Sequence, residues 1–321
     1  MKEKIELRYN PISDEWVIVS GSRQDRPNIP QNSCPLCPDG IEALGDYDLV
    51  SFENRYPALK REPQRVAKPD SYVFKKREAK GICEVVVYTK EHDLSLPQMP
   101  ILQIEKLIEM WVDRTKELQK YEFIKYIYIF ENRGQEVGAT LSHPHGQIYA
   151  FPFIPKRINA KIRGMEKWFY EYNECPICKV IEEELKDKKR IVYENKHFIG
   201  LVPFYARFPY EVHIYPKRHV DMIAYLSNKE KKDLADILKI ITMKYDKLFE
   251  IEFPYMMMLF QAPVNGEDLY DIFHFHIEFD PPKRTKDKIK WMASVETGTW
   301  TFINPLPPEE AAKQLRDIKV K

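Results

Sequence analysis

Two histidines flank a proline in the segment HPHGQ, residues 143–147, of a 321-residue chain that contains eight histidines. An imidazole can serve as a nucleophile as well as a general acid or base. Its attack on phosphorus gives a labile phosphoramidate, which suits the transfer of a phosphoryl or nucleotidyl group. Such a transfer requires hydrogen-bond donors around the phosphate oxygens, and Gln147, Thr140 and Ser142 lie within a few residues. The segment is therefore a candidate for nucleophilic catalysis at phosphorus, and a packed histidine pair without a chemical role is the alternative.

Cysteines indicate what one of these two histidines does. Four of the five cysteines form two Cys-x-x-Cys pairs, in CPLC and CPIC, and each pair is followed by one histidine and later by a His-x-His segment. In a reducing compartment such pairs are metal ligands or redox groups more often than disulfides. Two cysteines and two histidines complete a tetrahedral zinc site with no open position, so we expect a structural zinc ion in each half. The expected ligands are Cys34, Cys37, His92 and His143 in the first half, and Cys175, Cys178, His219 and His274 in the second.

The order of the expected elements repeats along the chain. After each cysteine pair come short apolar strands, a long amphipathic helix, a further strand and a His-x-His segment. The helices are expected over residues 100–121 and 228–250. We therefore expect an α+β fold of two tandem halves, residues 1–160 and 161–321, each an antiparallel sheet with a long helix, forming one compact unit. The histidines of the second metal site are assigned through this repeat, so ordinary packing of the second cysteine pair is the alternative there.

His145 has no ligand role if His143 binds the metal. It then lies beside a rigid metal site, with Gln147 two residues further along the same extended segment. In the second half, His276 is not followed by glycine and glutamine, so it lacks this context. We expect His145 to be the nucleophile and the second half to be catalytically silent, with His276 in a packing or supporting role.

Charge and hydropathy narrow the choice of function. Lys and Arg number 50 against 49 Asp and Glu, and the net charge of +1 argues against a general electrostatic nucleic-acid binder. No apolar stretch approaches the roughly eighteen residues of a membrane-spanning helix, and the first twenty residues contain no run typical of a signal peptide. We expect a cytoplasmic protein that binds neither nucleic acid nor membrane.

HPHGQ is similar to the active-site motif of the galactose-1-phosphate uridylyltransferase family, within the histidine-triad superfamily, so the resemblance implies histidine-triad-like halves. Other segments resemble the family in the same order: NPISDEWVIVSGSRQDRP, FENRYPAL, FENRGQEVGATLSHPHGQ and ETGTWTFINPLPPEEAAKQLR. The resemblance implies nucleotide and phosphate contacts at Arg23, Arg26, Asn54, Asn132, Gly138 and Thr140. It implies sugar-phosphate contacts at Lys290 and Glu296, with Asn304 in place of an expected glutamine.

The activity implied by the resemblance is a two-step exchange. His145 attacks the α-phosphorus of UDP-glucose, expels glucose 1-phosphate and becomes a uridylyl-histidine, from which galactose 1-phosphate takes the uridylyl group. Gln147 binds the transferring phosphate, and the second ring nitrogen of His145 donates to a fixed acceptor, expected to be a backbone carbonyl. The family also implies a homodimer with sites near the subunit boundary.

The second metal site departs from the family. Well-known members build it from carboxylate and histidine ligands, whereas this chain has CPIC, and Phe260 or Gln261 where a histidine is expected. A Cys₂His₂ site, as in more distant adenylyltransferase-like relatives, fits better. Two other functions therefore stay open as alternatives. One is phosphorolysis of ADP-glucose or a dinucleoside polyphosphate through the same histidine, and the other is zinc-stabilised nucleotide binding without turnover. The form HPHGQ, rather than a serine-containing version, favours uridylyl transfer.

Overall fold

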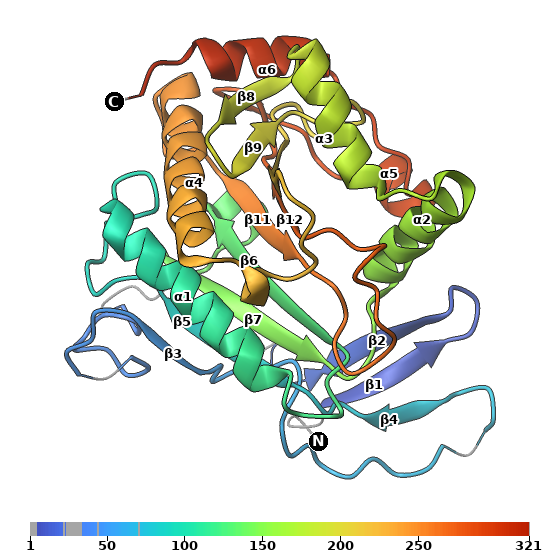
Figure 1. Cartoon of the computed structure of the whole chain (residues 1–321). Helices are drawn as coiled ribbons and strands as arrows, with labels where there is room; N and C mark the ends of the chain where they lie inside the picture. The colour runs from blue at the N-terminus through green and yellow to red at the C-terminus, as the bar shows by residue number, and fades with distance from the viewer. Residues whose placement is uncertain (1–4, 22, 24–33, 44, 70, 321) are drawn as a thin grey trace.

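Both long helices expected from the sequence form where apolar residues recur at helical spacing. Helix α1 (Ile101–Leu118) buries a stripe that includes Leu107 and Trp111, and α4 (Asn228–Phe249) buries one that includes Leu238. The two helices pack against each other and cover one face of a large sheet (Figure 1). None of the described helices is long and apolar enough to cross a membrane.

The computed structural model describes residues 5–21, 23, 34–43, 45–69 and 71–320. The strands are β1 (Ile5–Asn10), β2 (Glu15–Ser20), β3 (Val50–Glu53), β4 (Lys76–Glu78), β5 (Ile82–Val87), β6 (Tyr126–Arg133), β7 (His145–Phe151), β8 (Ile191–Glu194), β9 (Phe198–Leu201), β10 (Val212–Pro216), β11 (Tyr255–Phe260), β12 (His276–Asp280), β13 (Lys283–Thr285) and β14 (Lys288–Ile289). The other helices are α2 (Lys156–Tyr172), α3 (Pro176–Asp187), α5 (Ser294–Thr299) and α6 (Pro308–Asp317), with short 3₁₀ turns at Gln135–Val137 and Ile223–Tyr225.

The large sheet is antiparallel and runs through both halves of the chain. Its order is β3-β5-β7-β6-β11-β12-β10-β9-β8 in the described residues. The first four strands belong to the first half and the other five to the second, and the two sets join where β6 pairs with β11, with Glu131 opposite Met257. The expected α+β fold of tandem halves is confirmed. The sequence predicts a sheet in each half, whereas the paired edge strands merge the two sheets into one.

Side chains alternate between the two faces of the large sheet along each strand, so every second one points away from the face that α1 and α4 cover. In β7, Gly146 and Ile148 are buried towards the core, whereas His145 and Gln147 are half-buried on the opposite face. In β12 the corresponding face carries His276, and there α2 and α3 cover it (Figure 1). The two His-x-His segments therefore share one face of one sheet, open in the first half and covered in the second.

Helix α3 begins within the second cysteine pair. Cys175 is the residue before the helix, and Pro176 occupies its first position, where a missing N–H costs no helical hydrogen bond. Cys178 consequently lies on the first turn, close to Cys175. The segment CPIC thus combines a helix start with two sulfur ligands.

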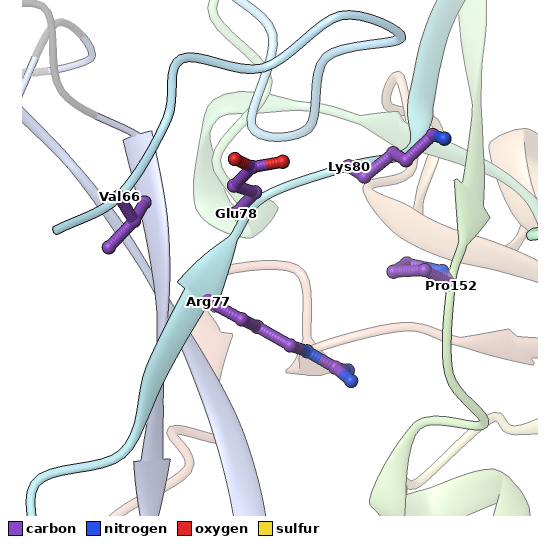
Figure 2. A pocket seen from close by; sticks show the side chains of 5 residues that line it. All are labelled: Val66, Arg77, Glu78, Lys80 and Pro152. Atoms are coloured by element: carbon purple, nitrogen blue, oxygen red, sulfur yellow. The ribbon is translucent and has the colours of Figure 1, made fainter. Parts of the chain in front are cut away.

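A separate sheet, β2-β1-β4, packs beside the end of β7. The guanidinium of Arg77 on β4 lies 4.1 Å from the ring centre of Trp16 and 5.4 Å from that of Phe153. This stacking holds the small sheet against the segment that follows β7. An open cavity of about 400 Å³ lies at this junction. It is lined by Val66, Arg77, Glu78, Lys80 and Pro152 (Figure 2).

Candidate functional site

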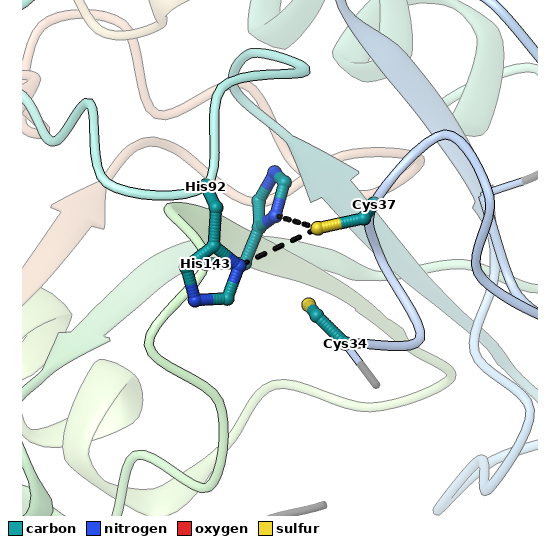
Figure 3. A group of neighbouring side chains, drawn as sticks. All are labelled: Cys34, Cys37, His92 and His143. Atoms are coloured by element: carbon teal, nitrogen blue, oxygen red, sulfur yellow. Dashed lines mark hydrogen bonds between the residues drawn. The ribbon is translucent and has the colours of Figure 1, made fainter. Parts of the chain in front are cut away.

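The first cysteine–histidine set comes together around one point (Figure 3). Cys37 Sγ lies 3.4 Å from His92 Nδ1 and 3.5 Å from His143 Nδ1. The four ligand atoms, with that of Cys34, all lie within 4.8 Å of one another. One ligand pair lies in the loop before β3, one histidine follows β5 and the other precedes β7, so the cluster ties three distant segments together. These residues could hold one metal ion.

The second set repeats this arrangement. Cys178 Sγ lies 3.4 Å from His219 Nδ1 and 3.5 Å from His274 Nδ1, and Cys175 Sγ lies 3.8 Å from His274 Nδ1. All four ligand atoms again lie within 4.8 Å of one another. The structure thus brings together all eight residues expected to bind metal. Because the second set is assembled like the first, it too could hold a metal ion.

Hydrogen bonds at the far side of each imidazole orient these four histidines. The Nε2 partners are the Ser142 hydroxyl for His92 (3.0 Å), the Thr89 carbonyl for His143 (2.7 Å), the Tyr270 carbonyl for His219 (2.5 Å) and the Pro216 carbonyl for His274 (3.1 Å). A carbonyl accepts only from a protonated ring nitrogen, so in the last three the lone pair is on Nδ1, towards the cysteines. Such outer contacts are typical of histidines that bind metals.

His145 has the opposite orientation. Its Nδ1 donates to the carbonyl of His143 at 2.8 Å, which leaves the ring lone pair on Nε2. The backbone acceptor expected from the sequence is therefore supplied by a residue of the first cysteine–histidine set. His143 carries both functions, because its ring belongs to the cluster and its carbonyl sets the tautomer of the neighbouring imidazole.

Three cavities, of about 610, 360 and 50 Å³, meet at His145 and Thr140. Asn132 lines the two larger ones. Arg23 and Gly138 line the middle one. Sequence reasoning missed the apolar walls of the smallest cavity, which are Leu36 and Val85. They gave no signal because only the fold brings β5 beside the cysteine loop.

Hydrogen bonds fix the polar residues around His145. Asn54 Nδ2 donates to Gln147 Oε1 at 3.2 Å, so the Gln147 amide N–H groups are left to donate elsewhere. The Arg23 guanidinium donates to the Tyr56 carbonyl at 3.0 Å and to the Tyr149 hydroxyl at 3.1 Å. The structure thus gathers the nucleotide-site residues expected from the sequence, apart from Arg26, which lies outside the described residues.

The three residues expected to bind the sugar phosphate lie elsewhere. Lys290 Nζ donates to Glu296 Oε1 at 2.6 Å, and both side chains are buried. Asn304 Nδ2 donates to the carbonyls of Ala206 and Phe208 at 3.1 and 3.2 Å. Within one chain, none of the three lines a cavity that contains His145.

Gly146 follows the nucleophile candidate and faces the core. A Cβ at this position would collide with the Tyr88 hydroxyl, and it would lie 3.0 Å from the Phe130 carbonyl. Tyr88 is fully buried, and its hydroxyl has no hydrogen-bond partner among the described residues. The glycine therefore allows β7 to lie close to this ring.

We expect Gly146→Ala to destabilise the protein by about 1–3 kcal/mol, because an added methyl in a packed core displaces its neighbours. We also expect transfer activity to fall roughly tenfold or more, because His145 moves with β7. Adding Tyr88→Phe, which removes the colliding oxygen, should recover part of both losses. Thermal unfolding and initial rates of the two single variants and the double variant measure this coupling. Stability of Gly146→Ala equal to that of the parent would contradict the prediction.

Glu131 is a buried acid beneath the site. Its Oε1 accepts from the Tyr255 hydroxyl at 3.1 Å, and burial raises the pKa of this carboxyl to about 7. Between the ordinary value of 4.5 and about 7, the folded protein holds a proton that the unfolded chain has released. Stability therefore falls as the pH rises through this window.

We expect Glu131→Gln to stabilise the protein at pH 8 by on the order of 3 kcal/mol, since the amide needs no proton to remain neutral. Near pH 4.5 the parent carboxyl is already neutral, and the variant should gain little. Thermal unfolding of both proteins at each pH measures the difference, and metal effects cancel within each pair. An equal gain at both pH values would show that burial of the charge is not the cause.

His276 occupies the position in β12 that His145 occupies in β7. Its Nδ1 donates to the His274 carbonyl at 2.8 Å, as in the first half. Its Nε2 differs, because it lies 3.0 Å from Lys161 Nζ, which also binds Glu278. Sequence reasoning missed Lys161, because only the packing of α2 on the sheet brings it there.

The fold and the site combine two tandem α+β halves with an imidazole, His145, beside a Cys₂His₂ set, an arrangement suited to an enzyme of group transfer. Models of the galactose-1-phosphate uridyl transferase N-terminal and C-terminal domains match residues 1–155 and 161–318. A galactose-1-phosphate uridylyltransferase of Thermotoga maritima is 62% identical over 318 residues, covering 99% of each chain. The chain belongs to the galactose-1-phosphate uridyl transferase family, which confirms the expected family and enzyme class.

Two further comparisons bear on the choice between uridylyl transfer and phosphorolysis. A solved uridylyltransferase structure superposes with a TM-score of 0.88 at 33% identity, covering 97% of both chains. An ADP-glucose phosphorylase of Arabidopsis thaliana is 28% identical over 340 residues, covering 98% of this chain and 93% of its own. The chain is thus much less similar to this phosphorylase than to the Thermotoga enzyme, which makes the phosphorylase reading the weaker one.

Proposed function

We propose that the protein transfers UMP between UDP-glucose and galactose 1-phosphate through a uridylyl group on His145. The observation that carries the proposal is the hydrogen bond from His145 Nδ1 to the His143 carbonyl, which places the nucleophilic lone pair on Nε2 beside the cavities. The family of the chain supports the choice of substrates.

In the first step His145 Nε2 bonds to the α-phosphorus of UDP-glucose, and the bond from this phosphorus to the bridging oxygen breaks. Glucose 1-phosphate leaves with that oxygen, and the ring of the uridylyl-histidine carries a positive charge. The His143 carbonyl stabilises this charge through its bond to Nδ1. In the second step a phosphate oxygen of galactose 1-phosphate attacks the same phosphorus, and the imidazole leaves with its lone pair restored.

Gln147 and its neighbours position the phosphate. Because Asn54 occupies Gln147 Oε1, the Gln147 amide is held with its N–H groups available to the phosphate oxygens. The remaining contacts are proposed for Arg23, Arg26, Asn132, Gly138 and Thr140. The apolar pair Leu36 and Val85 is proposed to contact the base.

Both cysteine–histidine sets are proposed to hold zinc. A tetrahedral zinc ion with Zn–S of about 2.3 Å and Zn–N of about 2.0 Å separates sulfur and nitrogen by roughly 3.5 Å. The Sγ–Nδ1 distances of 3.4 to 3.8 Å fit this geometry. With four protein ligands each ion is structural, and the first would hold the His143 backbone that orients His145. Thiolate ligands of this kind also support a reducing, cytoplasmic location.

The second half is proposed to be catalytically silent from residue 161 onward. His276 is almost fully buried, and the Lys161 ammonium lies against the ring nitrogen that would have to attack. A neutral imidazole whose lone pair accepts this hydrogen bond cannot bond to phosphorus.

A homodimer is proposed from the surface around the sugar-phosphate residues. Exposed apolar side chains lie on the segment that carries Lys290, Glu296 and Asn304, with Trp291 at 67% and Ile303 at 61% exposure. Patches of this kind mark protein interfaces. A dimer that buries the patch can bring these residues to the reaction cavity of the second copy, which the single chain does not do.

We expect Ile303→Glu to shift the protein towards monomers and to raise the dissociation constant of the dimer about a hundredfold. The reason is that a charge would be buried in an apolar contact. Transfer should fall with dimer content. Sedimentation velocity over a range of concentrations measures the change. Ile12→Glu is the matched control, since Ile12 is 96% exposed in the turn between β1 and β2. An unchanged dimer in Ile303→Glu would place the interface elsewhere.

The proposed function is tested by intact-protein mass after incubation with UDP-glucose without acceptor at mildly alkaline pH. We expect a gain of one uridylyl group, absent in His145→Ala and reversed by galactose 1-phosphate. An adenylyl gain from ADP-glucose without a uridylyl gain would replace the proposal with the phosphorylase function. No covalent adduct from either nucleotide sugar, with binding of both, would replace it with the binding module.

A further inference from the structure

The second half contains a cavity that the transfer reaction does not use. It measures about 580 Å³, close to the 610 Å³ of the largest cavity beside His145. Helices α2 and α3 form its roof, and β10 and β12 form its floor. Its lining residues include Lys161, Gly164, Trp168, Arg207, His276 and Glu278.

This cavity lies where the pairing of the repeated strands places the counterpart of the nucleotide site. Glu278 pairs with His213 of β10 just as Gln147 pairs with Val85 of β5. Tyr205 follows β9 as Tyr56 follows β3, and each lines the cavity of its own half. The repeat therefore carries a pocket at the same place on the same sheet face twice.

Four cations and four carboxylates line the cavity, and among the described residues one of these cations has no carboxylate partner. Three carboxylates are paired: Glu278 with Lys161, Glu184 with Arg190 and Glu183 with Lys179. The fourth, Glu211, accepts from His213 and from the backbone at residues 207 and 208. Among the described residues no carboxylate pairs with the guanidinium of Arg207, which lies 4.9 Å from the Phe302 ring centre. An anionic group is the complement of this cation.

The same cavity also has aromatic and polar side chains in its wall, and the aromatic ones favour a ligand that contains a ring. Trp168, Phe204 and Tyr205 line it, and the last two are largely exposed and so available to stack on a ligand. The Trp168 indole N–H and Glu184 Oε2 are buried without a hydrogen-bond partner among the described residues. Both residues line the cavity, so its wall combines polar with aromatic side chains.

We propose that this cavity binds a nucleoside 5′-monophosphate, with the base against the aromatic side chains and the phosphate towards Arg207. Binding does not lead to transfer, because Lys161 covers the ring nitrogen of His276. The second half is thus a binding site separate from the reaction, and the inference does not depend on the proposed UMP exchange.

The test uses the fluorescent aromatic anion 1-anilinonaphthalene-8-sulfonate on the metal-loaded full chain. Gly164→Leu fills the cavity, since an added Cβ there meets no atom within 4 Å and leucine favours the helix. Arg207→Ala removes the unpaired cation. We expect each variant to weaken probe binding about tenfold. Arg163→Leu is the matched control, because Arg163 is the exposed neighbour that does not line the cavity.

Displacement identifies the ligand class. We expect UMP or AMP to displace the part of the probe signal that Gly164→Leu abolishes, and ribose 5-phosphate to require at least tenfold higher concentration. Unchanged probe binding in both variants would overturn the site. Equal displacement by ribose 5-phosphate would overturn the requirement for a base, and failure of both nucleotides would overturn the ligand class. These outcomes do not depend on uridylyl transfer, so they are distinguishable from failure of the proposed function.

Discussion

His145→Ala is expected to lower the rate of uridylyl transfer by roughly 10⁴-fold or more while leaving fold and metal content intact. In the proposed route the imidazole forms the covalent bond, so without it no remaining group can carry the uridylyl moiety between the two half-reactions. Fold should persist because the side chain is half-buried at the cavity edge and is not one of the cluster ligands. Steady-state rates, metal analysis and thermal unfolding measure the three parts of this result.

His276→Ala is the matched control for that variant, since it removes the histidine at the corresponding position of the second half. We expect transfer within a few-fold of the parent, with some loss of stability because Lys161 loses a buried partner. Turnover by His145→Ala near the parent rate would refute the covalent route. A collapse of turnover in a folded His276→Ala would show that the second half is not silent.

Loss of a ligand from the first cluster is expected to have the second largest effect. If both sets hold zinc as proposed, Cys37→Ala should reduce metal from two ions per chain to one and lower stability by roughly 3 kcal/mol or more, because an ion bound there would link three distant segments. Transfer should also fall steeply, since the His143 carbonyl that orients His145 belongs to this cluster. Elemental analysis, thermal unfolding and initial rates test the result.

Two variants distinguish the effect of losing the metal from the effect of losing a thiol alone. Cys83→Ala removes a buried cysteine outside both clusters, so it should keep both ions and most of the activity. Cys178→Ala should lose only the second ion and destabilise the second half, while His145 keeps its orientation. Two ions per chain in Cys37→Ala would refute the assignment of the first site.

The sequence by itself determined the two ligand sets, the candidate nucleophile and the long helices. Each of these has a local or repeated signal: the Cys-x-x-Cys spacing, the segment HPHGQ, and apolar residues at helical intervals over 101–118 and 228–249. The repeat supplied the second ligand set, because equivalent residues recur in the same order. Such signals can be read without knowledge of the fold, because they depend only on residues that are close together in the sequence or that recur in the same order.

Only the tertiary structure decided how the two halves join and how they differ. The pairing of β6 with β11 merges two sheets, which no local pattern predicts, because the backbone of an edge strand can pair with many partners. The packing of α2 on β12 brings Lys161 to His276 over a separation of 115 residues. The walls at Leu36 and Val85 likewise depend on contacts across the sheet. One half thus keeps His145 at open cavities and the other a covered cavity, because long-range packing determines which of the two corresponding histidines faces a cavity and which meets a lysine.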